Sequence, residues 1–218
     1  MLYNSDRAET KTIWRTAELM VTAARTAPKA SGRDHLYAAI ADGEEKRALA
    51  DEMRRLGSLW NQSFIVRDGE HVEFAECIVL LGATDGPLLL ANCGYCGFSD
   101  CGACMRAKGR CAHNTIDLGI AIGSAVSVAA DHRVDNRVLY SAGKAALHMG
   151  LLPPEVRIAV GIPLSATSKN VFFDRGSEDH EAMLRRVMAQ RDAGSPVGTK
   201  KEGSGSTGMD AEAVLYKK

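Results

Sequence analysis

A dense run of cysteines between Cys93 and Cys111 constrains this chain more than any other feature of its sequence. Five of the six cysteines fall within these nineteen residues, with the spacing C-x2-C-x4-C-x2-C-x6-C and with glycines between them. Clustered thiolates bind metals, and glycines allow the backbone to turn tightly around a bound group. The segment 92–112 is therefore predicted to be a loop built around a metal ion or an iron–sulfur cluster.

The spacing of the cysteines favours one kind of site over the others. Structural zinc is commonly held by two ligand pairs that are about a dozen or more residues apart, whereas only four residues separate Cys96 from Cys101. A compact cage of cysteines favours an iron–sulfur cluster, with structural zinc and a disulfide or free thiols as the alternatives. The sixth cysteine, Cys77, lies in an apolar run and is expected to be a small buried core residue.

Composition and charge describe an ordinary globular chain. Its 218 residues are 45% hydrophobic, and 27 lysines and arginines balance 27 aspartates and glutamates. This balance argues against a dedicated nucleic-acid-binding protein, which usually carries a basic excess. We identify no signal peptide, and the longest apolar run is too short to predict a membrane span. A cytoplasmic protein is therefore expected, and in that compartment clustered cysteines serve as ligands rather than disulfides.

Hydrophobic periodicity predicts an α/β (α+β) domain with helices packed around a small central sheet. We expect one domain over residues 1–193 and a flexible, hydrophilic tail over 194–218. Residues 61–75 show no clear pattern. Helices are predicted over 6–27 (ended by Pro28), 36–40, 44–60, 116–130, 138–149 and 179–192, and strands over 76–81, 88–90 and 156–162.

The predicted helix 116–130 directly follows the cysteines and is apolar on every side, so it is expected to be buried all round. Gly119 and Gly123 lie on one face and allow another backbone or a flat cofactor to approach closely. Tight core packing is the simpler interpretation of these small residues. In a chain of this size, an all-round apolar helix also predicts a homodimer that buries it or its neighbours.

Four motifs stand in order along the chain: Asn92-Cys-Gly-Tyr-Cys-Gly-Phe, Asp117-Leu-Gly-Ile-Ala-Ile-Gly-Ser-Ala-Val, Val134-Asp-Asn-Arg-Val-Leu-Tyr-Ser and Gly161-Ile-Pro-Leu-Ser-Ala-Thr. Together they resemble an uncharacterised prokaryotic family of ferredoxin-domain proteins. The cysteine pattern also resembles a short motif that carries a 4Fe–4S cluster, which implies Cys93, Cys96, Cys101 and a more distant Cys111 as ligands. Cys104 is then left free; the alternative ligand set uses Cys104 in place of Cys111.

A second, weaker resemblance is to nitroreductase-like flavoproteins. It rests on Ala27-Pro28, the small-residue helix 116–130 and Gly161-Ile-Pro163, which occur in the same order. It implies a homodimer with FMN between the subunits. The polar loop residues that could contact a flavin or its phosphate are also interpretable as solvated loop residues; they are Lys29, Ser31, Lys169 and Asn170.

The sequence thus predicts an iron–sulfur redox protein that transfers electrons to an unidentified redox partner, with a flavin-dependent oxidoreductase as the more specific hypothesis. The alternative is a non-enzymatic binding or scaffold protein whose cysteine-rich loop holds structural zinc. The histidines of this chain are scattered along the sequence. The sequence contains no P-loop, Rossmann or nucleophile-elbow motif that would indicate another class of enzyme.

Overall fold

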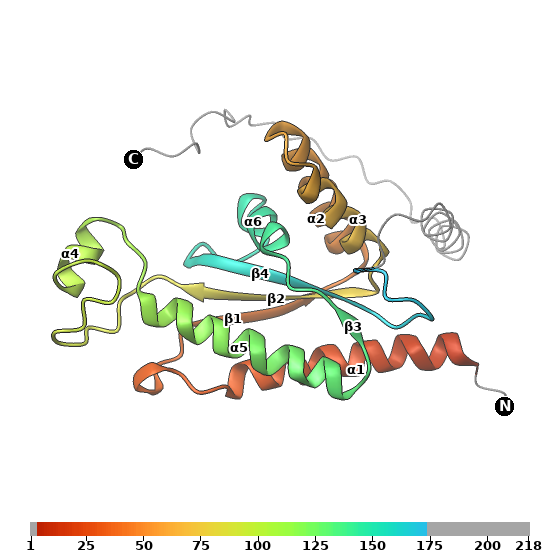
Figure 1. The fold of residues 1–218 in the computed structure, drawn as a ribbon, viewed down its shortest axis with the longest axis horizontal. Helices are drawn as coiled ribbons and strands as arrows, with labels where there is room; N and C mark the ends of the chain where they lie inside the picture. Colours follow the sequence, from red (N-terminus) through yellow and green to blue (C-terminus); the bar gives the residue numbers. More distant parts are fainter. Residues whose placement is uncertain (1–3, 174–218) are drawn as a thin grey trace, which may run out of the picture.

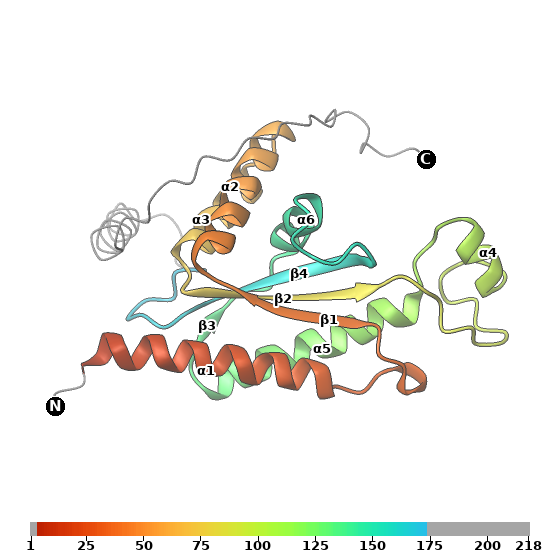
Figure 2. The ribbon, with the colours of Figure 1, turned by 180° about the vertical axis from the view of Figure 1, so that it is seen from behind.

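A computed structural model describes residues 4–173 and shows an antiparallel sheet between two layers of helices (Figure 1). Figure 2 shows the same arrangement from behind. The elements of the described residues follow in the order α1 (Ser5–Thr26), η1 (Ala30–Gly32), β1 (Leu36–Ala41), α2 (Gly43–Leu59), α3 (Ser63–Phe74), β2 (Cys77–Thr84), α4 (Cys101–Arg106), α5 (Ala112–Asp131), β3 (Asp135–Asn136), α6 (Tyr140–His148) and β4 (Val156–Ser165).

The sheet has the strand order β1-β2-β4-β3, and every pairing in it is antiparallel. Strand β2 lies inside the sheet and is buried along almost its whole length, as expected for a continuous apolar run covered on both faces. Cys77 pairs with Leu164, whereas Thr84 pairs with Val156. The chain that follows β2 therefore leaves the sheet at the end where β4 begins, and the chain that follows β4 leaves at the opposite end.

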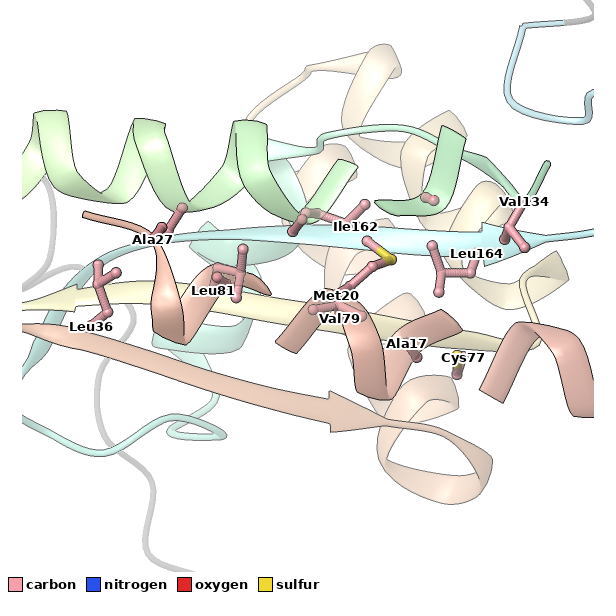
Figure 3. Close-up of a cluster of buried hydrophobic side chains, with 14 of the residues drawn as sticks. Ala17, Met20, Ala27, Leu36, Cys77, Val79, Leu81, Val134, Ile162 and Leu164 are labelled. Carbon is pink, nitrogen blue, oxygen red and sulfur yellow. The ribbon is translucent and has the colours of Figure 1, made fainter. Parts of the chain in front are cut away.

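Helices α1 and α5 cover one face of the sheet. Met20 of α1 packs with Val79, Leu81 and Ile162 in a continuous apolar cluster (Figure 3). These four side chains are at most 1% exposed, so this layer supplies much of the hydrophobic stabilisation of the fold. Ser124 of α5 donates a hydrogen bond to the carbonyl of Ala23 (3.0 Å), which ties the two helices together.

Helices α2, α3 and α6 cover the other face, where a second apolar cluster forms around Leu49, Met53 and Leu80. Helix α6 lies especially close to β4. A Cβ atom built on Gly143 would stand 1.9 Å from the carbonyl oxygen of Ala159, so only glycine fits at this contact.

The structure confirms most of the long predicted elements. The helices expected over 6–27 and 44–60 are α1 and α2, the strands expected over 76–81 and 156–162 are β2 and β4, and the helix expected over 138–149 is α6, preceded by the short β3. Residues 61–75, which showed no clear pattern, contain α3. The predicted helix 179–192 and the tail 194–218 lie outside the described residues.

Two short predictions are wrong. Residues 36–40 form strand β1 rather than a helix, because the run pairs along its length with β2. Residues 88–90 form no strand, since Leu89 has a φ of 59°, which is incompatible with an extended chain.

The prediction that helix 116–130 is buried all round is also wrong for the single chain. Helix α5 buries Leu118, Ala121 and Ala125 against the sheet and α1. Its opposite face carries Ile116 and Ile120, which are 49% and 41% exposed. Within residues 4–173, no helix combines the length and apolar character that a membrane crossing requires.

Candidate functional site

The cysteine-rich loop, residues 85–111, joins the end of β2 to the first turn of α5 and lies at one end of the sheet (Figure 1). Positive φ angles at Gly94 (62°) and Gly97 (82°) provide its tight turns. The short helix α4 begins at Cys101, where the Asp100 carboxylate accepts a hydrogen bond from the Ala103 N–H at 2.8 Å. This bond from the helix terminus lowers the pKa of Asp100.

Several polar contacts fix the base of this loop to the body of the protein. The Asp85 carboxylate pairs with Arg110 at 3.2 Å and with Arg157 at 2.9 Å. The Asn114 side chain, 4% exposed, donates hydrogen bonds to the carbonyls of Thr84 (3.2 Å) and Gly86 (2.9 Å). The protein's own hydrogen bonds and ion pairs therefore hold both ends of the loop.

Four cysteines border one pocket in this loop. They are Cys93, Cys96, Cys101 and Cys111, the set expected to hold the cluster. Their side chains are partly exposed, so the pocket is accessible from solvent.

The fifth loop cysteine, Cys104, is buried, with 1% of its surface exposed. Burial raises the pKa of its thiol, as do a hydrogen bond with Cys96 and the nearby charges of Cys96, Cys111 and Cys101. It is also tightly packed, because a Cβ atom on Gly109 would stand 3.0 Å from its sulfur and 2.5 Å from the ring of Phe98. Cys104 thus lies beside the pocket thiols without lining the pocket.

The donor set of this loop fits a thiolate-ligated group by its chemistry, since four thiols border one pocket and a fifth lies beside them. In residues 4–173, no three His, Cys, Asp or Glu side chains are drawn together closely enough to hold a metal ion. The structure therefore shows the shared pocket of the thiols and not a closed coordination shell.

Cys77 lies away from this loop, in β2 under helix α1 (Figure 3). It has no exposed surface, and burial raises the pKa of its thiol to about 12. Its neutral thiol packs in the core, as expected from its apolar sequence context.

The candidate flavin contacts fall into two separate places. Lys29 and Ser31 lie in or beside η1. The segment between α1 and β1, which contains η1, lies at the end of the molecule that carries the cysteine loop (Figure 1). The Lys29 ammonium donates to the carbonyls of Arg25 (2.5 Å) and Ala27 (2.9 Å), so it already serves the end of α1.

Two contacts bind this η1 turn to its surroundings. The Ala30 N–H donates to both carboxylate oxygens of Asp117 on α5, each at 3.1 Å. Arg33, just after the turn, donates to the carbonyl of Leu88 at 2.9 Å, and Leu88 lines the cysteine pocket. The η1 turn, the start of α5 and the cysteine loop thus form one connected region.

Lys169 and Asn170 belong to the segment that follows β4, and this segment leaves the sheet at the end opposite the cysteine loop (Figure 2). There the Asn170 amide donates to Asp135 at 2.9 Å. A single chain therefore does not bring these two residues together with Lys29 and Ser31.

Sequence reasoning missed His113 in the first turn of α5. Its Nε2 lies 3.5 Å from the Cys93 sulfur, its ring stacks on that of Tyr95, and it lines the cysteine pocket. The available signal was its position two residues after Cys111, at a helix start directly beside the cluster loop. Asn114 and Asp117 were likewise detectable as polar residues, three apart, in the first turns of a largely apolar helix.

The fold is nitroreductase-like. The nitroreductase CinD from Lactococcus lactis, in complex with chloramphenicol, matches with a TM-score of 0.52 and 13% identity over 77% of this chain and 85% of that chain. The FMN-dependent nitroreductase NfnB from Mycobacterium smegmatis, in complex with NADPH, gives a TM-score of 0.49 and 10% identity over 76% and 89%. At such identities, the likeness concerns the fold alone.

Sequence similarity identifies the family of this chain. An uncharacterized protein of Archaeoglobus fulgidus is 38% identical over 183 residues, which span 80% of this chain and 98% of that protein. Residues 107–175 match the family described as "Uncharacterized protein containing a ferredoxin domain (DUF2148)". The chain belongs to this family of ferredoxin-domain proteins, which confirms the resemblance found in its sequence motifs.

Proposed function

We propose that this protein is an iron–sulfur redox protein that transfers electrons through a 4Fe–4S cluster held by Cys93, Cys96, Cys101 and Cys111. The observation that carries the proposal is that these four cysteines border one pocket at the surface of the cysteine-rich loop. The ferredoxin domain in the description of the family supports the same chemistry. When bound, such a cluster accepts and releases electrons at a potential set by its protein surroundings.

The choice of Cys111 over Cys104 rests on their surroundings. Cys111 lines the pocket and immediately precedes α5, so a cluster bound there is linked directly to the hydrophobic core. Cys104 is 1% exposed and does not line the pocket, so it is less accessible to a group bound there. The set with Cys104 in place of Cys111 is the competing assignment, because Cys104 also lies near three of the pocket thiols.

A redox role is favoured over a structural zinc because protein contacts attach the ends of the loop to the body of the molecule. Asp85 and Asn114 already fix both of its ends through the contacts described above. Structural zinc typically supplies the folding energy of a segment that lacks its own core. A solvent-accessible pocket beside exposed aromatic and aliphatic side chains suits exchange of electrons with a partner better than permanent structural closure.

The test is anaerobic purification followed by an absorption spectrum and by iron, sulfide and zinc analysis. We expect a brown protein with iron and sulfide, and a colourless protein with stoichiometric zinc would contradict the proposal. Cys111→Ser should lose most of the iron, whereas Cys104→Ser and the core control Cys77→Ala should retain it. Loss of iron in Cys104→Ser with retention in Cys111→Ser would reassign the fourth ligand.

We further propose that FMN binds beside the η1 turn, which would make the protein a flavin-dependent oxidoreductase. Support comes from the contacts that connect the η1 turn to Asp117 of α5 and, through Arg33, to Leu88 of the cysteine loop. The resemblance of Ala27-Pro28, the small-residue helix and Gly161-Ile-Pro163 to nitroreductase-like flavoproteins is a further support. Lys169 and Asn170 could join the same flavin only if a second subunit contributes them.

The flavin proposal predicts flavin fluorescence in the supernatant of acid-denatured protein, or saturable binding of added FMN. Ser31→Ala should weaken that binding, and Ser58→Ala, a hydroxyl deletion on the exposed surface of α2, should not. Absence of released flavin together with no binding of added FMN would remove the flavin and leave the cluster proposal intact.

A further inference from the structure

His113 is the one histidine of the described chain that lines the cysteine pocket. Its Nε2 atom lies 3.5 Å from the sulfur of Cys93, within the range of a hydrogen bond to sulfur. The side chain is held in the first turn of α5, a helix of twenty residues packed on the sheet, so the ring starts from a rigid element. The Cys93 thiol therefore faces an imidazole that is attached to a rigid helix.

Tyr95 keeps the His113 ring in this orientation. The two rings are stacked, with centroids 5.5 Å apart and an interplanar angle of 17°. Tyr95 itself is 75% exposed, so it covers the outer side of the imidazole while its own outer face meets solvent. Such a stack favours this plane of the His113 ring, in which Nε2 lies 3.5 Å from the Cys93 sulfur.

The chemistry of the pair determines which atom donates. Cys93 is a thiolate when it ligates a cluster, and a thiolate sulfur can only accept a hydrogen bond. The neutral imidazole carries one N–H, and a bond to the sulfur requires that Nε2 carry it. Hydrogen bonds to the sulfurs of a cluster are among the levers that set its potential, because they stabilise the more negative, reduced form.

We propose that His113 donates a hydrogen bond from Nε2 to the Cys93 sulfur and thereby raises the reduction potential of the cluster. His113 is thus a positioning residue that acts through Cys93, with Tyr95 holding its ring. This inference rests on the proposed function, since it requires Cys93 to be a ligand. It goes further by naming the side chain that adjusts the potential at which electrons are passed on.

The experiment measures the reduction potential and the iron and sulfide content of anaerobically purified variants. His113→Phe keeps a flat ring against Tyr95 but has no N–H donor. His113→Gln restores a donor of similar reach. His132→Phe makes the same ring change at the exposed far end of α5 and serves as the matched control.

We expect His113→Phe to keep its cluster with a potential lower than that of the wild type, His113→Gln to recover much of the difference, and His132→Phe to match the wild type. A His113→Phe protein with full iron and an unchanged potential would overturn the inference. Loss of iron from both His113 variants, as complete as in Cys111→Ser, would overturn it by making His113 itself a ligand. A wild-type protein without an iron–sulfur chromophore would instead refute the proposed function, so the two failures are distinguishable.

Discussion

Cys77 and the loop cysteines carry the same thiol group in different surroundings. Cys77 has no exposed surface, and burial raises the pKa of its thiol to about 12, whereas four of the loop cysteines are partly exposed. We therefore predict that iodoacetamide at pH 8 alkylates loop cysteines of the cluster-free, folded protein and leaves Cys77 unmodified. Peptide mass mapping checks this prediction, with protein unfolded in guanidinium as the control in which Cys77 reacts. Alkylation of Cys77 at the rate of the loop thiols would show that β2 is not covered as described.

The same burial makes stability depend on pH. The pKa of Cys77 is raised from 9.0 to about 12 in the folded protein, so above pH 9 the unfolded chain releases a proton that the folded chain keeps. The protonated thiol therefore contributes fully to the free energy of unfolding below pH 9, and this contribution is lost as the pH rises towards 12. At pH 10 the loss is about 1 kcal/mol. Urea unfolding at pH 8 and pH 10 should therefore show a smaller loss of stability in Cys77→Ala than in the wild type. Equal losses in the two proteins would contradict the assigned pKa.

The Asp117 carboxylate makes a contact with a distant part of the chain, which its sequence neighbours do not reveal. Its carboxylate is 3% exposed and accepts the Ala30 N–H, a donor 87 positions earlier in the chain. Asp117→Ala should cost about 1–3 kcal/mol of unfolding free energy, because it leaves that N–H without its acceptor. Asp117→Asn keeps an acceptor oxygen and should cost less. Chemical denaturation of the three proteins tests this order, and equal stabilities would show that the contact contributes nothing.

At the scale of single elements, the closest packing is that of α6 on β4. A Cβ atom on Gly143 would stand 1.9 Å from the Ala159 carbonyl oxygen and 2.5 Å from the next backbone nitrogen, so backbone atoms must shift to admit it. Gly143→Ala should destabilise the protein by about 1–3 kcal/mol despite the higher helix propensity of alanine. The neighbouring exposed position provides the control, and Lys144→Ala should remain within about 0.5 kcal/mol of the wild type. A thermal or urea melt of Gly143→Ala that equals the wild type would show that α6 moves away freely.

The elements that sequence reasoning found are those with strong, long patterns, and its errors fall on short runs. The five residues 36–40 form β1 because β2 offers its edge, a partner that no local pattern discloses. Helix α3 was obscured because charged residues interrupt its apolar positions, yet Ile65 and Val72 are buried against the sheet. The apolar run 88–90 forms no strand because Leu88 turns inward to the pocket while Leu89 takes a left-handed conformation.

At the scale of the whole molecule, the candidate site divides into a local part and a part set by topology. The local part, the cysteine-rich loop before α5, could be predicted because its residues are adjacent in the sequence. The order of the strands sets the second part. It determines the contacts of the η1 region with Asp117 and Leu88, and it separates Lys169 from Lys29. Antiparallel pairing of β2 with β4 sends the segments after them to opposite ends, and periodicity does not encode that arrangement.

At the same scale, the exposed face of α5 is a feature that residues 4–173 of a single chain leave unexplained. Ile116 and Ile120 are 49% and 41% exposed, and a Cβ atom on Gly119 or Gly123 would meet no atom of residues 4–173 within 4 Å. These residues are spaced three or four apart, so they form one stripe along the helix. A second copy of the chain is the partner we propose for this stripe, since small residues flanked by isoleucines allow two helices to pack closely.

We predict that the wild-type protein is a homodimer at micromolar concentration and that Ile120→Glu converts it to a monomer. A glutamate in the middle of the stripe would place a charge in an apolar interface, where its burial is unfavourable without a partner. Light scattering coupled to size-exclusion chromatography gives the mass of each protein. Leu59→Glu is the matched control, because Leu59 is 58% exposed at the end of α2, outside the stripe, and its replacement should leave the dimer intact. A monodisperse wild-type monomer, or a dimer that survives Ile120→Glu, would exclude α5 as the interface. A dimer formed through α5 could then not bring Lys169 and Asn170 of one subunit to a flavin site shared with the other.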